Sequence, residues 1–84
     1  MKSALCPTAN EVWLQCSGYK VLPLNRSLYA VAQRLERMIE SRLYAKADSR
    51  RRDFYDVELT DGWAYIHIRD QVRTIYLIAY ANFI

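Results

Sequence analysis

The sequence predicts an α+β fold in which one amphipathic helix packs on one face of an antiparallel sheet. Three observations lead to this prediction. Apolar and polar residues alternate over residues 53–80, apolar residues recur at helical spacing over residues 25–47, and a shorter alternating stretch spans residues 10–23. The expected element order is therefore ββαβββ, and its last three strands form a meander.

The N-terminal part is expected to contain a tail and a hairpin. Residues 1–9 show no periodicity, so we expect a tail or an extended arm there. Residues 10–23 are predicted to form a hairpin, because Ser17-Gly18 separates two alternating stretches. Pro23 would end the second strand, since proline has no N–H to donate.

The central part is expected to form one helix over residues 25–47. Asn25 or Ser27 can cap its start by accepting a hydrogen bond from a free backbone N–H. Six apolar residues at spacings of three and four form one stripe: Leu28, Val31, Leu35, Met38, Ile39 and Leu43. This helix can cover only one face of a sheet.

The first turn of the meander is predicted at Asp61-Gly62. A two-residue hairpin loop needs positive φ at both positions, and Asp-Gly is a strong signal for it. The loop would place Leu59 opposite Ala64.

The second turn is predicted at Asp70-Gln71, which would place Tyr65 opposite Tyr76. A loop one residue longer would turn every side chain of the third strand to the other side of the sheet.

This register gives the sheet two chemically different faces. Face one is apolar and is expected to receive the helix; it carries Tyr55, Val57, Leu59, Ala64, Ile66, Ile68, Ile75, Leu77 and Ala79. Face two carries aromatic residues among charged ones, and an exposed apolar cluster of this size is uncommon on a monomer.

The first candidate site is the aromatic part of face two with its polar rim. It comprises Trp63, Tyr65, Tyr76, Ile78 and Tyr80, together with His67, Arg69 and Arg73. Aromatic rings beside arginines can stack bases and bind phosphates, and the same residue types are enriched at protein-binding hot spots. Two structural alternatives stay open: the N-terminal hairpin folds over this face, or cross-strand aromatic pairs simply stabilise the sheet.

The second candidate site is a basic patch, expected at the end of the helix. It comprises Arg42, Lys46, Arg50, Arg51 and Arg52. Residues 25–52 hold eight cationic residues against three carboxylates, whereas the rest of the chain is slightly acidic. The patch would attract phosphates or an acidic partner. The helix dipole and ordinary solvation of loop charges are the structural alternatives.

The sequence predicts neither a catalytic nor a metal site. His67 is the single histidine, and Asp56, opposite it in the predicted register, would be near enough to orient its ring. No nucleophile with an activating neighbour and no glycine-rich phosphate loop can be assembled. Cys6 and Cys16 lack zinc-site spacing and are expected to be free thiols. We therefore expect no enzyme, no cofactor and no small-molecule substrate.

Composition points to a folded protein. The chain has 84 residues, of which 52% are hydrophobic, and only two glycines and two prolines, so we expect a single folded domain. It contains no apolar run near the length of a membrane span and no signal-peptide pattern. The expected location is the cytoplasm, without membrane attachment.

Residues 73–82 read Arg-Thr-Ile-Tyr-Leu-Ile-Ala-Tyr-Ala-Asn. This segment resembles the last strand of RelE/HigB-like toxins, although it lacks the lysine of their Tyr-Ala-Lys-Asn-like ending. The resemblance implies a helix followed by a three-stranded meander and cleavage of ribosome-bound messenger RNA. It also implies that Arg69, Arg73, His67 and Tyr80 occupy the positions of functional residues. The family usually has two helices where one is predicted here.

The function expected from the sequence is that of a small non-enzymatic interaction module. It would regulate or inhibit a larger protein or nucleoprotein partner, and its size and charge would suit a phage or mobile-element protein directed at a nuclease complex. One alternative is an RNA- or DNA-binding protein or a RelE-like ribonuclease. A homodimer joined through face two is the other.

Overall fold

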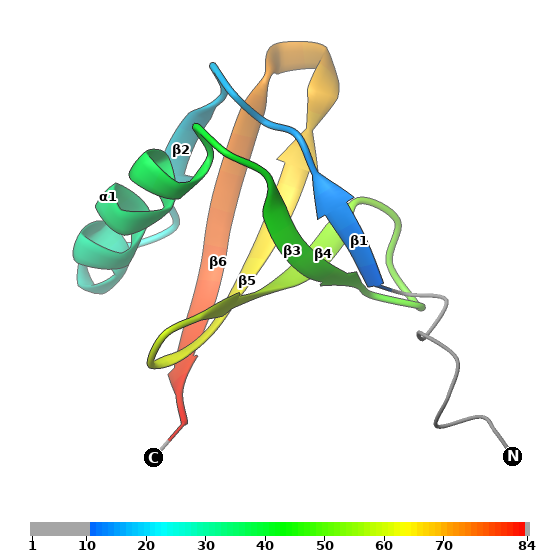
Figure 1. The fold of residues 1–84 in the computed structure, drawn as a ribbon. Coiled ribbons are helices and arrows are strands. Elements are labelled where there is room, and N and C mark those ends of the chain that lie inside the picture. The colour runs from blue at the N-terminus through cyan, green and yellow to red at the C-terminus, as the bar shows by residue number, and fades with distance from the viewer. Residues whose placement is uncertain (1–10, 84) are drawn as a thin grey trace, which may run out of the picture.

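The computed structural model describes residues 11–83, and within them the predicted α+β class is confirmed (Figure 1). The elements are strands β1 (Glu11–Leu14) and β2 (Lys20–Pro23), 3₁₀ turn η1 (Arg26–Leu28), helix α1 (Tyr29–Met38), strands β3 (Leu43–Ala47), β4 (Phe54–Leu59) and β5 (Gly62–Arg69), 3₁₀ turn η2 (Asp70–Val72), and strand β6 (Thr74–Asn82). The predicted tail of residues 1–9 lies outside this range.

One mixed sheet of six strands runs in the order β1-β3-β4-β5-β6-β2. All neighbouring strands are antiparallel except β2, which pairs with β6 in parallel. The sheet is therefore mixed, whereas an antiparallel sheet was expected. The predicted hairpin over residues 10–23 is wrong, because β1 and β2 lie at opposite edges of the sheet. Their apolar residues face the same core, but each strand pairs with a strand that is distant in the sequence: β1 with β3, and β2 with β6.

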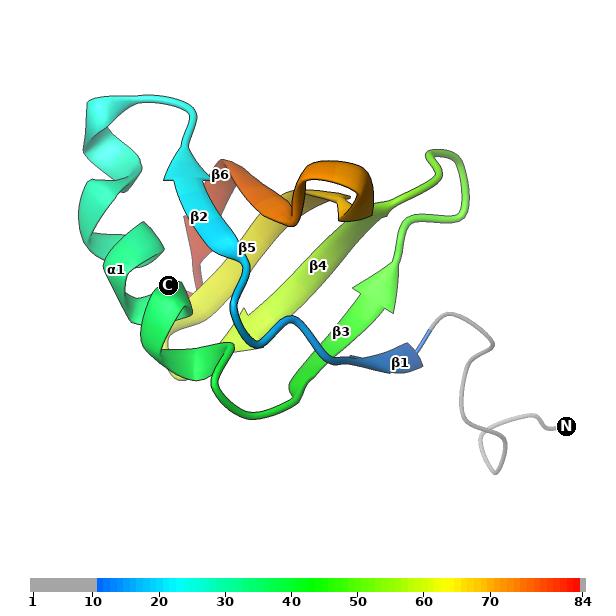
Figure 2. The ribbon, with the colours of Figure 1, turned by 90° about the horizontal axis from the view of Figure 1, so that it is seen from above.

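The short connection between β1 and β2 makes the sheet curl. Neighbouring strands are about 4.8 Å apart, so the two edges of a flat six-stranded sheet would be about 24 Å apart. Residues 15–19 must join those edges, and even a fully extended chain from Leu14 to Lys20 reaches only about 21 Å. The connection in fact turns at Cys16, whose carbonyl accepts the Tyr19 N–H at 2.9 Å. The sheet therefore wraps around face one, and Figure 2 shows this segment crossing the strands between β1 and β2.

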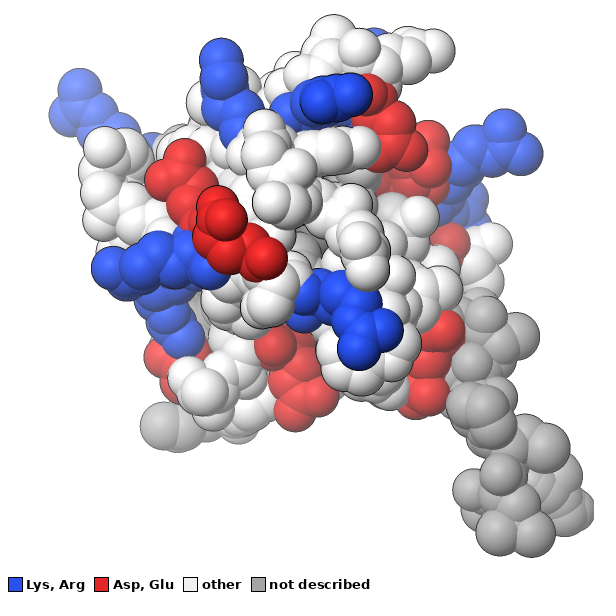
Figure 3. Space-filling model, turned by 45° about the horizontal axis from the view of Figure 1, so that its top comes forward, with Lys and Arg blue, Asp and Glu red and all other residues white. Residues whose placement is uncertain are grey.

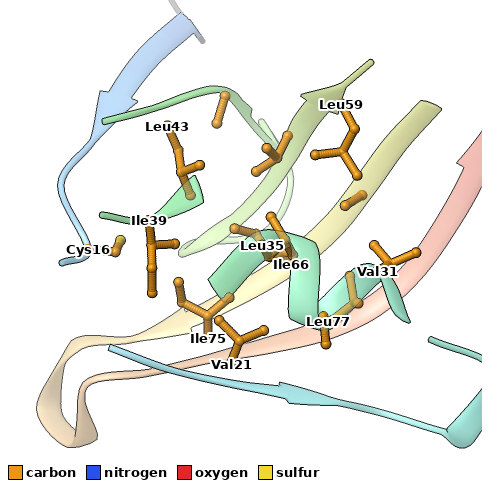
Figure 4. Packing of buried hydrophobic residues seen from close by; sticks show 14 of the residues in the cluster. Cys16, Val21, Val31, Leu35, Ile39, Leu43, Leu59, Ile66, Ile75 and Leu77 are labelled. Atoms are coloured by element: carbon orange, nitrogen blue, oxygen red, sulfur yellow. The ribbon is translucent and has the colours of Figure 1, made fainter. Parts of the chain in front are cut away.

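Helix α1 and the β1–β2 connection close the core on face one (Figure 4). The predicted stripe is confirmed at Leu28, Val31, Leu35 and Ile39, which are buried. They pack with buried residues of the sheet and the connection: Cys16, Val21, Leu43, Ala45, Val57, Leu59, Ala64, Ile66, Ile68, Ile75 and Leu77. Of residues 11–83, no helix is long and apolar enough to span a membrane.

The helix is much shorter than the predicted range of residues 25–47. Asn25 caps η1 by accepting the Ser27 N–H at 3.0 Å, and the helix ends at Met38. Leu43–Ala47 instead forms β3 between β1 and β4. This segment has side chains suited to a helix, but strand pairing on both sides overrides local propensity, a common effect of tertiary context.

The first turn of the meander begins one residue earlier than predicted, which shifts the strand pairing by two residues. Gly62 pairs with Leu59, so the loop consists of Thr60 and Asp61, and Gly62 does not have positive φ. Glycine is needed there for space, because a Cβ on Gly62 would lie 2.3 Å from the Ala81 carbonyl oxygen. An even shift of register leaves the two faces unchanged.

The second turn is longer than predicted, and β6 contains an irregularity. The connection comprises η2 and Arg73, which has φ 48°, and it places His67 opposite Tyr76. Beyond Leu77, Ile78 is an extra residue, so the register shifts by one. Such a β-bulge reverses the faces of the residues after it. Tyr80 therefore lies opposite Ala64 on face one, which corrects the prediction that it belongs to face two.

Replacing Gly62 with Ala should lower the free energy of unfolding by about 1–3 kcal/mol, because a new methyl group would collide with backbone. Gly18 provides the matched control, since it has φ 88° and open space around it. Asn tolerates that conformation, so Gly18→Asn should cost well under about 1 kcal/mol. Gly62→Asn should be at least as harmful as Gly62→Ala. Urea denaturation measures all three, and equal losses at the two sites would contradict the packing argument.

Candidate functional site

Face two is the outer surface of the curled sheet, and no helix or strand of residues 11–83 packs over it. β1 and β2 extend the sheet at its edges, so residues 11–23 do not cover this face. Strand pairing places a row of large and charged residues on it: Trp13, Leu22, Tyr44, Lys46, Phe54, Asp56, Glu58, Trp63, Tyr65, His67, Arg69 and Tyr76.

Four rings on three strands form an aromatic row, which we define as Tyr65, Phe54, His67 and Tyr76. Phe54 and His67 are parallel within 3° with centroids 4.2 Å apart, and Phe54 also stacks with Tyr65 at 5.6 Å. Tyr76 is tilted against His67 at 6.2 Å. The Arg51 guanidinium lies 5.3 Å from the Phe54 centroid. The ring faces in the centre of the row are therefore occupied by neighbouring side chains.

Phe54 was not among the predicted site residues, although the alternation of β4 places it on face two. It lies opposite His67, and Asp56 lies opposite Tyr65. The predicted pairing of Asp56 with His67 is therefore wrong. The imidazole is placed by stacking against Phe54 and not by an opposing carboxylate.

A cationic side chain lies over the ring of each of the two tryptophans on this face. Lys46 Nζ lies 5.3 Å from the Trp63 ring centroid, and the Arg42 guanidinium lies 5.0 Å from that of Trp13. Tyr44 packs against Trp13 at 5.2 Å, and Phe83 meets Trp63 edge-on at 6.3 Å. Each of the two cation–π contacts is worth about 0.5–1 kcal/mol at an exposed position.

The predicted basic patch is divided by the structure. Arg42 and Lys46 lie beside the tryptophans, whereas Arg50, Arg51 and Arg52 lie in the loop between β3 and β4. The helix ends at Met38, so its dipole does not account for these charges.

Asp48 anchors the β3–β4 loop. Its carboxylate accepts the Tyr65 hydroxyl at 2.5 Å and the Arg50 N–H at 2.9 Å, while its own N–H donates to the Phe54 carbonyl at 2.8 Å. The bond from Tyr65, and after it the bond from Arg50, lowers the pKa of Asp48. These contacts hold the loop in one shape, and its three arginine side chains are exposed.

An open hollow of about 740 Å³ adjoins this loop. Its lining comprises Lys46, Ala47, Asp48, Ser49, Arg50, Arg51, Asp56 and Tyr65. A neighbouring hollow of about 300 Å³ shares Lys46 and Asp56 with it and extends to Trp63. Partial burial, and then the nearby Asp48 carboxylate, raises the pKa of Asp56. Face two therefore holds negative as well as positive groups near its centre.

An apolar corner completes the face, defined by Leu22, Leu24, Tyr76 and Ile78. Leu22 lies opposite Tyr76 and is 40% exposed, and Leu24, which directly follows β2, is 64% exposed. Ile78 is the extra residue of the bulge and is half-buried. Sequence reasoning missed both leucines, because it paired β2 with β1 and not with β6.

Tyr80 belongs to a different cluster. Its hydroxyl donates to Asp61 Oδ1 at 2.6 Å, and Arg34 Nη2 on α1 donates to the same oxygen at 2.9 Å. The Arg34 guanidinium, and then the Tyr80 hydroxyl, lowers the pKa of Asp61 to about 2. This cluster ties the helix to the β4–β5 loop.

Residues 11–83 hold no group of three or more His, Cys, Asp or Glu side chains placed to bind a metal ion. Cys16 is a buried thiol whose pKa is raised by burial and then by Asp70. Cys6 lies outside the described residues.

No protein-family model, no curated protein and no solved structure matches this chain. The resemblance to RelE/HigB-like toxins thus stays a prediction.

Replacing Asp61 with Asn should flatten the acid dependence of stability. Because the pKa of Asp61 is lowered in the folded protein from 3.8 to about 2, its stabilising effect is complete above about pH 4 and is lost as the pH falls toward about 2. Urea midpoints of the wild type should therefore fall more steeply over this interval than those of Asp61→Asn. Glu36→Gln removes an exposed carboxylate on α1 and should leave the pH dependence of the urea midpoint as in the wild type. If Asp61→Asn showed the same pH dependence as the wild type, Asp61 would not be the group responsible.

Proposed function

We propose that this protein is a small non-enzymatic interaction module that binds a larger protein through face two. The observation that carries the proposal is the apolar corner beside the aromatic row on an uncovered sheet. Exposed Leu22 lies opposite Tyr76, exposed Leu24 follows two residues later, and the ring row continues from Tyr76 across β5 and β4. Aromatic residues are enriched in the desolvated centre of protein interfaces, where a few of them carry most of the binding energy.

The arrangement of the rings favours a protein over a nucleic acid. Bases bind to single-strand-binding sheets by stacking on open ring faces. Here Phe54 is stacked with His67 and Tyr65, and cations lie over Trp13 and Trp63. Two exposed leucines would also gain nothing from a phosphate backbone.

The charges on face two support the same choice. Asp56 and Glu58 lie on β4 in the middle of the face, where they would repel phosphates. Lys46 lies opposite Asp56, so cations and carboxylates alternate across the sheet. A protein surface can complement such a pattern at the rim of an interface. By covering a surface of its partner, the module would act as a regulator or inhibitor.

Tyr76→Ala should weaken partner binding by about 30-fold or more, the range of a hot-spot residue. The measurement is capture from a lysate of the source cell on immobilised protein, identification of the captured protein, and titration of the purified partner. Tyr29→Ala is the matched control, because Tyr29 is 61% exposed on α1, away from face two. Circular dichroism should show both variants folded.

Equal binding by Tyr76→Ala and wild type, or loss of binding in Tyr29→Ala, would refute the assignment of face two. Light scattering gives an independent check, in which a monomer at micromolar concentration is expected. A stable dimer abolished by Leu22→Asp would mean that a second copy of this chain, and not another protein, occupies the face.

A further inference from the structure

Six exposed cationic residues gather at one end of the sheet. We call them the basic rim: Lys20, Arg50, Arg51, Arg52, Arg69 and Arg73. Hydrogen bonds bring their segments together, since the Ile68 N–H donates to the Asp53 carbonyl and the Lys20 N–H to the Arg73 carbonyl, both at 2.9 Å. The β3–β4 loop, the β5–β6 connection and the start of β2 therefore meet at this end.

The rim has no carboxylate partner of its own in the described part of the chain. The one ion pair among residues 11–83 joins Arg34 to Asp61, which belong to another cluster. Three carboxylates lie near the rim: Asp48, Asp53 and Asp70. Two of them accept a hydrogen bond from a tyrosine hydroxyl, Asp48 from Tyr65 at 2.5 Å and Asp70 from Tyr19 at 2.6 Å. Six cations thus face three carboxylates, and the rim is positively charged without internal ion pairs.

We propose that the basic rim binds an acidic segment of the protein that occupies face two; this inference rests on the proposed function. The two surfaces are continuous, because Arg51 lies over Phe54 of the aromatic row, and Lys20 and Leu22 lie on the same strand. Arginine side chains bind carboxylates with two parallel hydrogen bonds, which gives direction as well as attraction. The rim would orient the partner, while the apolar corner supplies most of the affinity.

A protein carboxylate suits the rim better than a phosphate backbone does. A nucleic acid needs a continuous positive track, whereas Asp48, Asp53 and Asp70 interrupt this one. Figure 3 shows Lys and Arg side chains projecting at separate points of the surface with carboxylates between them. Separate cations match the discrete carboxylates of a folded or extended acidic segment.

The test uses fluorescence anisotropy with three labelled probes of equal charge: a peptide rich in Glu with interspersed Leu, single-stranded DNA and duplex DNA. The peptide should bind most tightly, with an affinity that falls as salt rises. The triple variant Arg50→Ala, Arg51→Ala and Arg52→Ala should bind it about tenfold more weakly, which corresponds to three lost exposed charge pairs. The double variant Arg26→Ala and Arg37→Ala removes exposed cations near α1 and should bind like wild type.

Tighter binding of either DNA, or equal weakening by the rim and helix variants, would overturn the inference. Replacing the three arginines with Lys keeps the charge and removes the paired hydrogen bonds, so it should restore only part of the affinity. Capture of the partner by the Tyr76→Ala variant and by the triple arginine variant distinguishes failure of this inference from failure of the proposed function. Capture lost in Tyr76→Ala but unchanged in the triple arginine variant overturns the acidic-segment inference alone. Capture unchanged in Tyr76→Ala overturns the proposed function and, with it, this inference.

Discussion

The short connection between β1 and β2 sets the curvature of the sheet and, through it, the positions of the core and of face two. Five residues join the two opposite edges of a six-stranded sheet, which is possible only if the sheet curls. The curl brings buried Cys16 of the connection and Leu35 of α1 onto the same apolar core. It also makes face two the outer surface. One short segment thus separates the two faces into a core and an open surface.

The polar contacts on the open surface divide its groups into those that are engaged and those that are free. Tyrosine hydroxyls donate hydrogen bonds to Asp48 and Asp70. Three cationic side chains lie over aromatic rings: Arg42, Lys46 and Arg51. Asp48 and Asp70 keep their negative charges, because a neutral hydroxyl donates a hydrogen bond to each without removing the charge. Arg50 and Arg52 are exposed and form no ion pair within residues 11–83, so the rim keeps cations that a partner can bind.

The bulge at Ile78 separates two roles that a regular strand would have combined. Tyr76 before it stays on face two, whereas Tyr80 after it turns to the helix side. There it joins Arg34 and Asp61, which link α1 to the β4–β5 loop. The extra residue, Ile78, directly follows Leu77, which pairs with Pro23 between the two exposed leucines. A single insertion in the ladder thus contributes to the stability of the fold and to the apolar corner.

Local periodicity in the sequence is enough to predict several features of this fold. The two faces of the meander were predicted correctly up to Leu77, because both register errors were even and an even shift keeps every side chain on its side. The helical stripe was correct as far as Ile39 for the same reason of local spacing. Long-range contacts make Leu43–Ala47 a strand, pair β2 with β6, and thereby bring Leu22 to the candidate site. These depend on contacts between segments far apart in the chain, which local patterns do not encode.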